Sequence, residues 1–231
     1  MGNVSHIAII LDGNRRFAKR LMLEPWKGHE YGAKKVEALI DWCYELGIFE
    51  LTIYSFSMQN FNRPKQEFDY LMKIMREAFE KFKDDPKVDQ YGIKVNILGR
   101  YQLFPPDVVE IFDTVMKKTA HNNKFIINFA MAYGGREELL DAIKAIAQET
   151  ANGKLDPQTI DEHTIRSHLY TASEPEIIIR TGGEKRLSNF LPWQSVYSEL
   201  FFVDKAWPEF EKEDLLAVLE EFSRRERRFG K

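Results

Sequence analysis

The stretch His6-Ile-Ala-Ile-Ile-Leu-Asp12-Gly-Asn-Arg-Arg16 decides the fold, because an apolar run ends in it on a carboxylate followed by polar residues. A continuous apolar run of this length is typical of a parallel strand that is buried on both faces. In open α/β sheets, ligands bind where such strands end. We therefore expect a functional site directly after this run, at Asp12.

The residues that follow Asp12 favour an anion. Gly13 lets the backbone approach a ligand closely, and Asn14, Arg15 and Arg16 offer hydrogen-bond donors and positive charge to phosphate oxygens. A carboxylate beside a phosphate is repulsive, so Asp12 indicates a bridging Mg²⁺ that takes oxygen ligands from both groups. From the local pattern alone, a strand followed by a solvated basic turn is an equal alternative.

A second polar cluster follows another apolar run, at 177–179. Arg180 stands at the end of this run, two glycines bend the chain, and Arg186 and Ser188 can converge on an anion. The alternative is a loop in which the arginines pair with nearby glutamates. Glu199 precedes the last apolar run, and we expect it to face the same region if its strand runs beside the others.

Apolar runs alternate along the chain with amphipathic helical stretches, which is the pattern of an α/β fold. In the stretch 66–82, Phe and Met recur at three- and four-residue spacing. Most such stripes are core, but these side chains also make adaptable walls for a hydrocarbon tunnel. We predict one domain over 1–231, with helices around a mostly parallel sheet of about six strands. The strands are predicted at 7–11, 50–56, 93–98, 125–131, 176–179 and 200–203.

Composition excludes several classes of protein. The net charge of -3, from 33 basic and 36 acidic residues, gives no overall case for nucleic-acid binding. Cys43 is the only cysteine, so an internal disulfide is excluded. Common nucleotide, zinc and serine-hydrolase motifs are absent from the sequence. With no signal-peptide or membrane-spanning pattern, we expect a cytoplasmic protein whose membrane contact, if any, is peripheral.

Several long motifs occur in a fixed order along almost the whole chain: HIAIILDGNRRFAKR near the start, KGHEYG at 27–32, FSMQNFNRP at 56–64, AYGGREEL at 132–139, IIIRTGGEKRLSNFLPWQSVYSELFF at 177–202 and RERRFG at 225–230. In this order they resemble the cis-prenyltransferase, or undecaprenyl diphosphate synthase, family. The DGNRR form, with arginine where many bacterial members carry glycine, resembles archaeal and eukaryotic members more closely.

The resemblance implies a Mg²⁺-dependent enzyme that condenses isopentenyl diphosphate onto an allylic diphosphate, forms cis double bonds and releases pyrophosphate. It implies catalytic roles for Asp12 and Asn60, the latter on a mobile loop. It implies metal ligands at Asp12 and Glu199. The residues implied for the allylic diphosphate are Gly13, Asn14, Arg15, Arg16, His29 and Arg63. Those implied for isopentenyl diphosphate are Arg180, Arg186 and Ser188, with Arg228 and Gly230 from a second subunit of a homodimer or heterodimer. Those implied for the product tunnel are Ser55, Phe56, Phe68 and Leu71.

Some alternatives stay open at this point. For His29, the alternative is a structural histidine near the start of a helix. Gln59 and Pro25 depart from the family pattern, in the mobile loop and near the allylic site respectively. The same fold could serve a short-chain, irregular or cyclising synthase, or an accessory subunit without activity. A trans-prenyltransferase needs two DDxxD helices, and the nearest match, at 84–88, carries valine and proline and is predicted to be a solvated loop.

Overall fold

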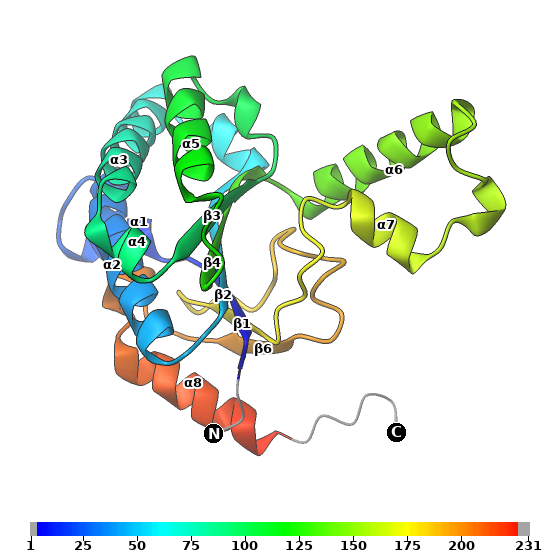
Figure 1. Cartoon of the computed structure of the whole chain (residues 1–231). Coiled ribbons are helices and arrows are strands. Elements are labelled where there is room, and N and C mark those ends of the chain that lie inside the picture. Colours follow the sequence, from blue (N-terminus) through cyan, green and yellow to red (C-terminus); the bar gives the residue numbers. More distant parts are fainter. Residues whose placement is uncertain (1–3, 226–231) are drawn as a thin grey trace.

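Six strands, all parallel, form one sheet in the order β3-β4-β2-β1-β5-β6 (Figure 1). The computed structural model describes residues 4–225 of the chain. Each predicted strand is present, with ends that differ from the prediction by at most two residues. The strands are β1 (His6–Ile10), β2 (Glu50–Ser57), β3 (Ile93–Leu98), β4 (Phe125–Tyr133), β5 (Ile177–Arg180) and β6 (Glu199–Phe202).

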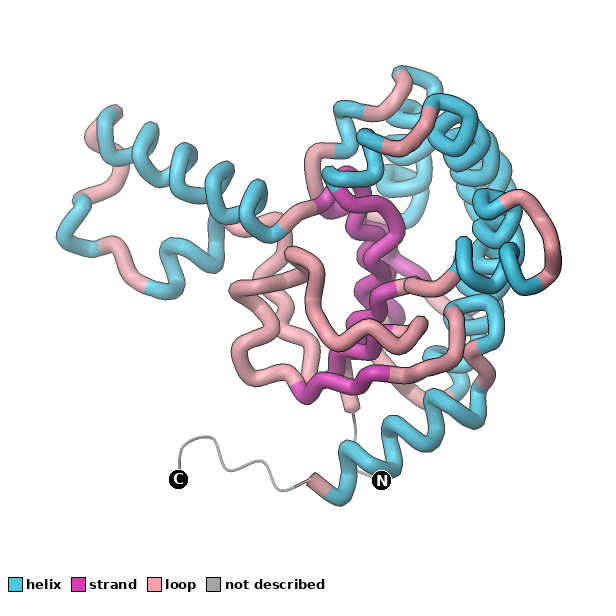
Figure 2. Tube along the Cα trace, turned by 180° about the vertical axis from the view of Figure 1, so that it is seen from behind, coloured by secondary structure: helices cyan, strands magenta, loops and turns pink. Residues whose placement is uncertain are grey.

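Helices occupy the connections from β1 to β5, and one further helix follows β6. They are α1 (Asn14–Arg20), α2 (Gly28–Glu45), α3 (Lys65–Lys83), α4 (Pro86–Gln90), α5 (Pro106–Thr119), α6 (Gly135–Ala151), α7 (Glu162–His168) and α8 (Lys212–Arg224). Helices α2 to α5 lie on one side of the sheet, whereas α6 and α7 project as a pair from the other side (Figure 1). Seen from behind, loops cover the strands on the side of α6 and α7 (Figure 2). No helix within residues 4–225 is long and apolar enough to cross a membrane.

Both faces of the sheet are buried, which explains the continuous apolar run at the start of the chain. Side chains alternate between the faces of a strand. Ile7 and Ile9 therefore join the larger core, which contains the apolar stripe of α3. Ala8 and Ile10 join a smaller core, to which Phe190 of the covering loop contributes.

Two predictions of local structure were wrong in detail. The stretch 84–88 is not a solvated loop: α4 begins at Pro86, and the Asp85 carboxylate caps it by accepting a hydrogen bond from the Lys87 backbone N–H at 2.9 Å. The side chain of Val88 is buried against the core, and this burial explains why the stretch is ordered as a helix rather than exposed as a loop. The first strand ends at Ile10 rather than at residue 11, so Asp12 lies two residues beyond the strand instead of directly after it.

Candidate active site

Two loops meet at the carboxyl edge of the sheet, after β1 and after β5. These strands are neighbours, with Ile10 in register with Arg180. In the sheet, β2 lies on one side of β1 and β5 lies on the other. The two loops therefore lie on either side of the point where the order of the strands changes direction. The Thr181 hydroxyl fastens them together: it accepts a hydrogen bond from the Asp12 backbone N–H at 3.1 Å and donates one to the Asp12 carbonyl at 2.8 Å.

The Asp12 carboxylate lies between cations from both loops. Its Oδ2 accepts a hydrogen bond from Arg180 Nη2 at 2.9 Å, and its Oδ1 lies 3.2 Å from Arg16 Nη2. Oδ1 also accepts a hydrogen bond from the Gly13 backbone N–H at 2.6 Å. Burial opposes ionisation of Asp12, but the Arg180 hydrogen bond and the charges of both arginines outweigh it and lower the carboxyl pKa. Asp12 is therefore an anion at neutral pH.

Arg180 is a buried cation with one hydrogen-bond donor to spare. Only 5% of the residue is exposed. Its Nη1 donates to the Ser188 hydroxyl at 2.7 Å and to the Arg186 carbonyl, so it also shapes the loop that follows. Within residues 4–225 its Nε is buried without a hydrogen-bond partner. A buried charged donor without an acceptor is costly, so an anionic ligand at this position would stabilise the site.

Glycine is required at two positions in these loops where the backbone packs closely against its neighbours. Gly182 has a φ of 84°, and a Cβ placed there would lie 2.6 Å from Arg16 Nη2. Gly13 has a φ of 102°, and its Cβ would lie 2.7 Å from the Cα of Ala206. A side chain at Gly182 would displace the Arg16 guanidinium from its place beside Asp12, and one at Gly13 would push the loop after β1 away from Ala206, which follows β6.

A second charged cluster lies beside the first, at the starts of α2 and α3. His29 is the second residue of α2, and its Nε2 lies 3.1 Å from Arg63 Nη1. Because a guanidinium can only donate, Nε2 accepts this hydrogen bond. Burial lowers the pKa of His29, so its ring is neutral at neutral pH. The structure thus brings together His29 and Arg63, two of the residues predicted for the allylic site.

Glu67 organises this second cluster, although it was not predicted as a site residue. Its side chain is 2% exposed, and its Oε1 lies 3.0 Å from Arg63 Nη1, 3.7 Å from His29 Nε2 and 3.8 Å from Arg15 Nε. The neighbouring His29 ring and the charge of Arg63 lower the Glu67 pKa despite burial. The i,i+4 spacing of Arg63 and Glu67 is the one signal in the sequence that indicates the pair.

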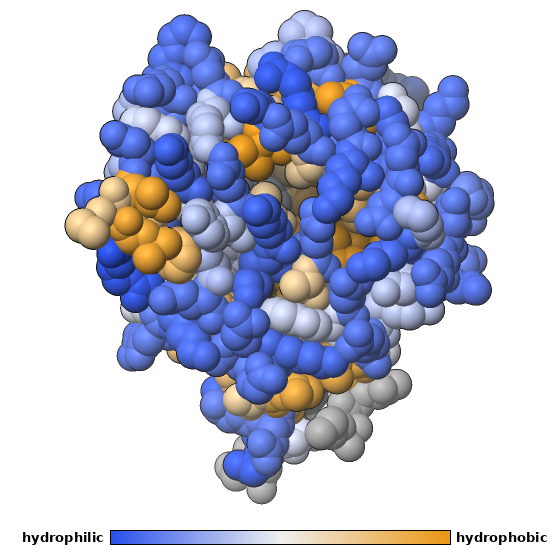
Figure 3. All heavy atoms as spheres, turned by 90° about the vertical axis from the view of Figure 1, so that its left-hand side faces the viewer, coloured by the Kyte–Doolittle hydropathy of each residue, from blue (hydrophilic) through white to orange (hydrophobic). Residues whose placement is uncertain are grey.

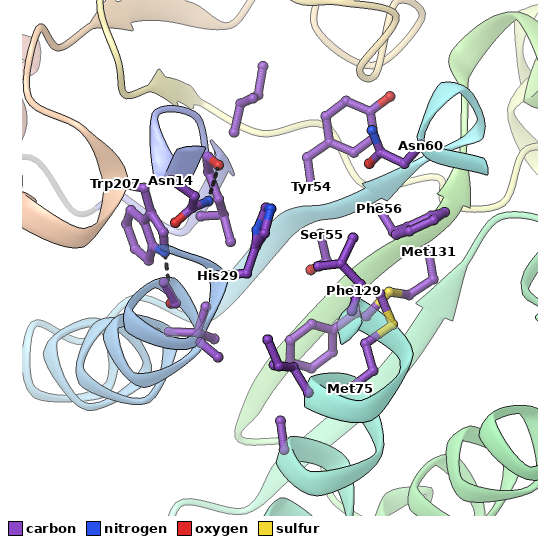
Figure 4. A pocket seen from close by; sticks show the side chains of 18 of the residues that line it. Asn14, His29, Tyr54, Ser55, Phe56, Asn60, Met75, Phe129, Met131 and Trp207 are labelled. Atoms are coloured by element: carbon purple, nitrogen blue, oxygen red, sulfur yellow. Dashed lines mark hydrogen bonds between the residues drawn. The ribbon is translucent and has the colours of Figure 1, made fainter. Parts of the chain in front are cut away.

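Asn60 and Asn14 line the same region but have structural partners of their own. Asn60 lies in a 3₁₀ helix (Met58–Asn62), and its Oδ1 accepts a hydrogen bond from the Ser57 backbone N–H at 3.0 Å. Asn14 donates from Nδ2 to the Leu11 carbonyl at 3.0 Å (Figure 4). Its Oδ1 is buried without a partner in the described part of the chain. Asn14 thus retains an unused acceptor at the start of α1.

The two clusters stand at the mouth of a cavity of about 470 Å³ between α2, α3 and the sheet. Figure 3 shows a hollow with hydrophobic atoms at its floor and hydrophilic atoms around it. Its wall is apolar below the mouth, where Figure 4 shows Met75, Phe129 and Met131 pointing inward. Of the residues predicted for a tunnel, Ser55, Phe56 and Leu71 line the cavity. Phe68 is not among its lining residues and packs against Phe56, at 6.2 Å between ring centroids.

Trp207 is a second residue that sequence reasoning missed. It is fully buried and lines the cavity. Its backbone N–H donates to the Asp12 carbonyl at 2.9 Å, and its indole N–H donates to the Gly32 carbonyl on α2 at 2.9 Å (Figure 4). It therefore joins the β1 loop to the helix that carries His29. Nothing in the sequence around Trp207 indicates these two hydrogen bonds.

The structure does not bring Glu199 to Asp12. Glu199 is the first residue of β6, in register with Ile177, so it lies at the amino edge of the sheet. Its carboxylate pairs instead with Arg225, at 2.7 Å. Because β6 runs parallel to β1, the residue that begins β6 lies at the opposite edge of the sheet from the residues that follow β1. Arg228 and Gly230 lie outside the described residues.

A cation at Asp12 would need ligands from outside this chain. Within residues 4–225, no group of three or more His, Cys, Asp or Glu side chains could hold a metal ion. Mg²⁺, however, is commonly bound through one or two carboxylates and the phosphates of a substrate rather than by a protein cage. The Asp12 carboxylate is ionised and its side chain is 30% exposed, so it fits this mode of binding.

Comparison with known proteins gives consistent matches over nearly the whole chain. A family model described as "Putative undecaprenyl diphosphate synthase" matches residues 10–230. A tritrans,polycis-undecaprenyl-diphosphate synthase (geranylgeranyl-diphosphate specific) of Pyrococcus horikoshii is 49% identical over 98% of this chain and 86% of its own length. An isoprenyl transferase of Thermus thermophilus is 43% identical over 98% of this chain and 88% of its own.

A solved structure has a similar fold over the same extent. Lavandulyl diphosphate synthase from Lavandula x intermedia, in complex with dimethylallyl diphosphate, superposes with a TM-score of 0.93. The two chains are 34% identical, and the match covers 99% of each.

Proposed function

The chain belongs to the undecaprenyl diphosphate synthase family of prenyl-transferring enzymes, and from this premise we propose that it condenses isopentenyl diphosphate onto an allylic diphosphate primer to make a cis-polyprenyl diphosphate. The observation that carries the proposal is the placement of two cationic clusters at the mouth of one apolar cavity. Two diphosphates and a hydrocarbon chain need this combination of surfaces.

We assign the allylic diphosphate to the loop after β1 and to the start of α2. Gly13 directly precedes α1, Asn14, Arg15 and Arg16 begin it, and His29 with Arg63 faces the same mouth. The neutral His29 ring already accepts from Arg63, so its Nδ1–H is free to donate to a phosphate oxygen. The growing hydrocarbon would then lie in the apolar cavity between α2 and α3.

We assign isopentenyl diphosphate to the loop after β5. Arg180 supplies a buried cation with a free Nε–H, and Ser188 supplies a hydroxyl beside it. Arg186 lines the cavity and its side chain is 61% exposed, so it can turn toward a ligand. Arg228 and Gly230 of a second subunit would complete this site in a dimer.

In the proposed reaction the allylic C–O bond breaks and pyrophosphate leaves with the bonding electron pair. The alkene of isopentenyl diphosphate attacks the allylic carbon, a C–C bond forms, and a proton passes from the new chain to the released pyrophosphate or to a nearby side chain. Mg²⁺, held by Asp12 and the diphosphate, would supply positive charge to the leaving group. Arg16 stabilises the same developing charge, Arg180 holds the isopentenyl diphosphate beside it, and the apolar wall below the mouth excludes water from the carbocation.

Geranylgeranyl diphosphate is the primer that we propose. The basis is the specificity named for the Pyrococcus horikoshii relative and others that are 44–49% identical. The cavity of about 470 Å³ between α2 and α3 is consistent with a long apolar substrate tail. A homodimer is part of the proposal, and the exposed apolar side chains Leu140 and Ile143 on α6 are candidate contacts. The lipid nature of the product would give the protein a peripheral contact with membranes.

The irregular coupling of two five-carbon units is the second candidate function. It is favoured by the superposition on lavandulyl diphosphate synthase, whose structure holds dimethylallyl diphosphate. Both reactions use the same cationic mouth, but the irregular one needs no space for a long chain. The two candidates therefore differ in the product and not in the first binding step.

The test is incubation of purified protein with radiolabelled isopentenyl diphosphate, Mg²⁺ and one allylic primer at a time, from five to twenty carbons. Products are dephosphorylated and separated by chain length. We expect long polyprenols, formed best from the twenty-carbon primer and lost when a chelator removes Mg²⁺. A single ten-carbon branched or cyclic product would establish the irregular reaction instead. No incorporation with any primer would contradict both.

A further inference from the structure

The apolar cavity has charged residues at its far end. Glu37 on α2 and Lys81 on α3 line it there, together with Asp85, which follows α3. The Lys81 ammonium lies 2.8 Å and 2.7 Å from the two carboxylate oxygens of Glu37. This ion pair connects the two helices that form the cavity wall.

The pair lies far from the reacting groups. Glu67, in the first turn of α3, contacts His29 at the mouth, whereas Lys81 is in the last turn. Lys81 is fourteen positions after Glu67, which corresponds to about 21 Å along the helix at about 1.5 Å per residue. The α3 residues that line the cavity between these ends are apolar: Leu71, Ile74, Met75, Ala78 and Phe79.

The chemistry of the wall therefore changes at Glu37 and Lys81. A hydrocarbon chain that lengthens along the apolar part gains from each carbon that is removed from water. At the ion pair this gain stops, because the charged groups are hydrated: 51% of the Glu37 side chain and 63% of the Lys81 side chain are exposed. A chain that passed between them would have to displace that water and separate the charges.

We propose that the Glu37–Lys81 ion pair, with Asp85 beside it, ends the product cavity and so limits the length of the polyprenyl product. The proposal rests on the polyprenyl synthase function above. Because the pair is exposed, it is individually weak, and it acts as a soft limit that yields a distribution of lengths rather than a single product.

The chain offers a matched control on the same helix. Asp41 lies one turn after Glu37 on α2 and pairs with Lys87 of α4, with Nζ–O distances of 2.8 Å and 2.7 Å. Neither residue is among those that line the cavity. Neutralising this second pair removes the same type of charge from the same helix without changing the end of the cavity.

The experiment compares the wild-type chain with three double variants, using geranylgeranyl diphosphate and labelled isopentenyl diphosphate. The variants are Glu37→Gln/Lys81→Met, the charge exchange Glu37→Lys/Lys81→Glu, and the control Asp41→Asn/Lys87→Met. We expect the neutral variant to make products at least one five-carbon unit longer than wild type. The charge exchange keeps the pair, so we expect wild-type lengths from it and from the control.

Products of unchanged or shorter length from the neutral variant would overturn the proposal, as would equal lengthening in the Asp41 control. Thermal unfolding of each variant shows whether it is folded, and the single variant Lys81→Met replaces the double variant if the latter unfolds. Failure of the underlying function is distinguishable, because the wild-type chain would then make no polyprenyl product from this primer and both proposals would fall together.

Discussion

Asp12 serves the site and the fold at the same time. Its carboxylate is the proposed metal ligand, and it also neutralises Arg180, whose side chain is 6% exposed. Removing the acid would leave that guanidinium buried with an unpaired charge. A substitution at this position therefore has two effects, which can be separated by the choice of the replacing residue.

We expect Asp12→Asn to lower kcat/KM by about 10²- to 10³-fold while the protein stays folded, because the amide has the shape of the carboxylate and its single oxygen can still accept the hydrogen bond from Arg180. Asp12→Ala should lose activity similarly and also lose about 1 to 3 kcal/mol of stability, since the buried donor is left unsatisfied. Steady-state kinetics and chemical denaturation measure the two effects. Full activity of a folded Asn variant would contradict the metal-ligand assignment.

Arg186 tests whether the two diphosphate sites are separate. We expect Arg186→Ala to raise the KM for isopentenyl diphosphate by about 10- to 100-fold, as one charge-assisted contact is lost, with a smaller effect on the allylic primer. The exposed side chain contributes little to the fold, so stability should change by less than about 0.5 kcal/mol. Lys185→Ala, at the neighbouring position that does not line the cavity, is the control. An equal rise in both KM values argues against two sites.

At the scale of single residues, the sequence predicted groups that follow strands and missed groups that act across the fold. Asp12 and Arg180 were predicted because each follows an apolar run, and strand register then brings them within 2.9 Å. Glu67 and Trp207 gave no comparable signal, since their contacts depend on where α2 packs. The prediction put Glu199 at the wrong edge of the sheet, because a polar residue before an apolar run and a polar residue after one give the same kind of signal in the sequence.

Among the contacts between secondary-structure elements, the close packing of α1 against α2 most directly determines the geometry of the cavity mouth. Gly28 begins α2, and a Cβ there would lie 2.0 Å from the Asn14 carbonyl oxygen. Gly32 faces the Asn14 side chain in the same way, with a Cβ at 2.3 Å from Oδ1. His29, next to Gly28, is thereby held beside the start of α1.

We expect Gly28→Ala to destabilise the protein and to impair the primer site. Alanine gains at most about 1 kcal/mol in helix propensity, whereas a clash with a backbone oxygen in a packed region costs about 1 to 3 kcal/mol. The helices must also separate, which moves His29 from Arg63 and should raise the KM for the primer. Lys34→Ala on the exposed face of α2 is the control. A variant as stable and active as this control would show that the helices can yield without cost.

Elements were predicted well where local pattern and tertiary burial agree. All six strands follow from apolar runs, and the stripe of α3 follows from its period. The order of the strands in the sheet did not follow, because parallel pairing is decided by how the intervening helices pack. The apolar stripe predicted both core and tunnel, and the structure shows both: Met72 lies in the core, while Met75 also lines the cavity.

At the scale of the whole molecule, a row of buried polar side chains crosses the sheet near its amino edge. His6 Nε2 lies 2.8 Å from Thr52 Oγ1, and Asn128 donates to Thr52 at 3.0 Å and to Glu50 at 2.6 Å. Asn96 donates to Asn128 at 2.8 Å and extends the row to a fourth strand. The apolar run that opens the chain thus begins in a polar network that joins β1, β2, β4 and β3.

This network makes stability depend on pH through His6. Burial lowers the His6 pKa below its ordinary value of about 6.5, although Glu50 and Glu176 oppose the shift. The unfolded chain therefore takes up a proton at a pH where the folded chain does not. Stability from this group is complete above about pH 6.5 and is lost as the pH falls below it, by up to about 1.4 kcal/mol per pH unit for one proton.

We expect the free energy of unfolding to fall more between about pH 7.5 and about pH 5.5 in the wild-type chain than in His6→Gln, because glutamine does not titrate. His29, whose pKa is also lowered, contributes the same loss to both proteins and cancels from the comparison. Chemical denaturation at the two pH values, in one buffer of constant ionic strength, measures the difference. Equal losses in the two proteins would mean that the buried His6 ring takes up its proton without disturbing the polar network that crosses the sheet.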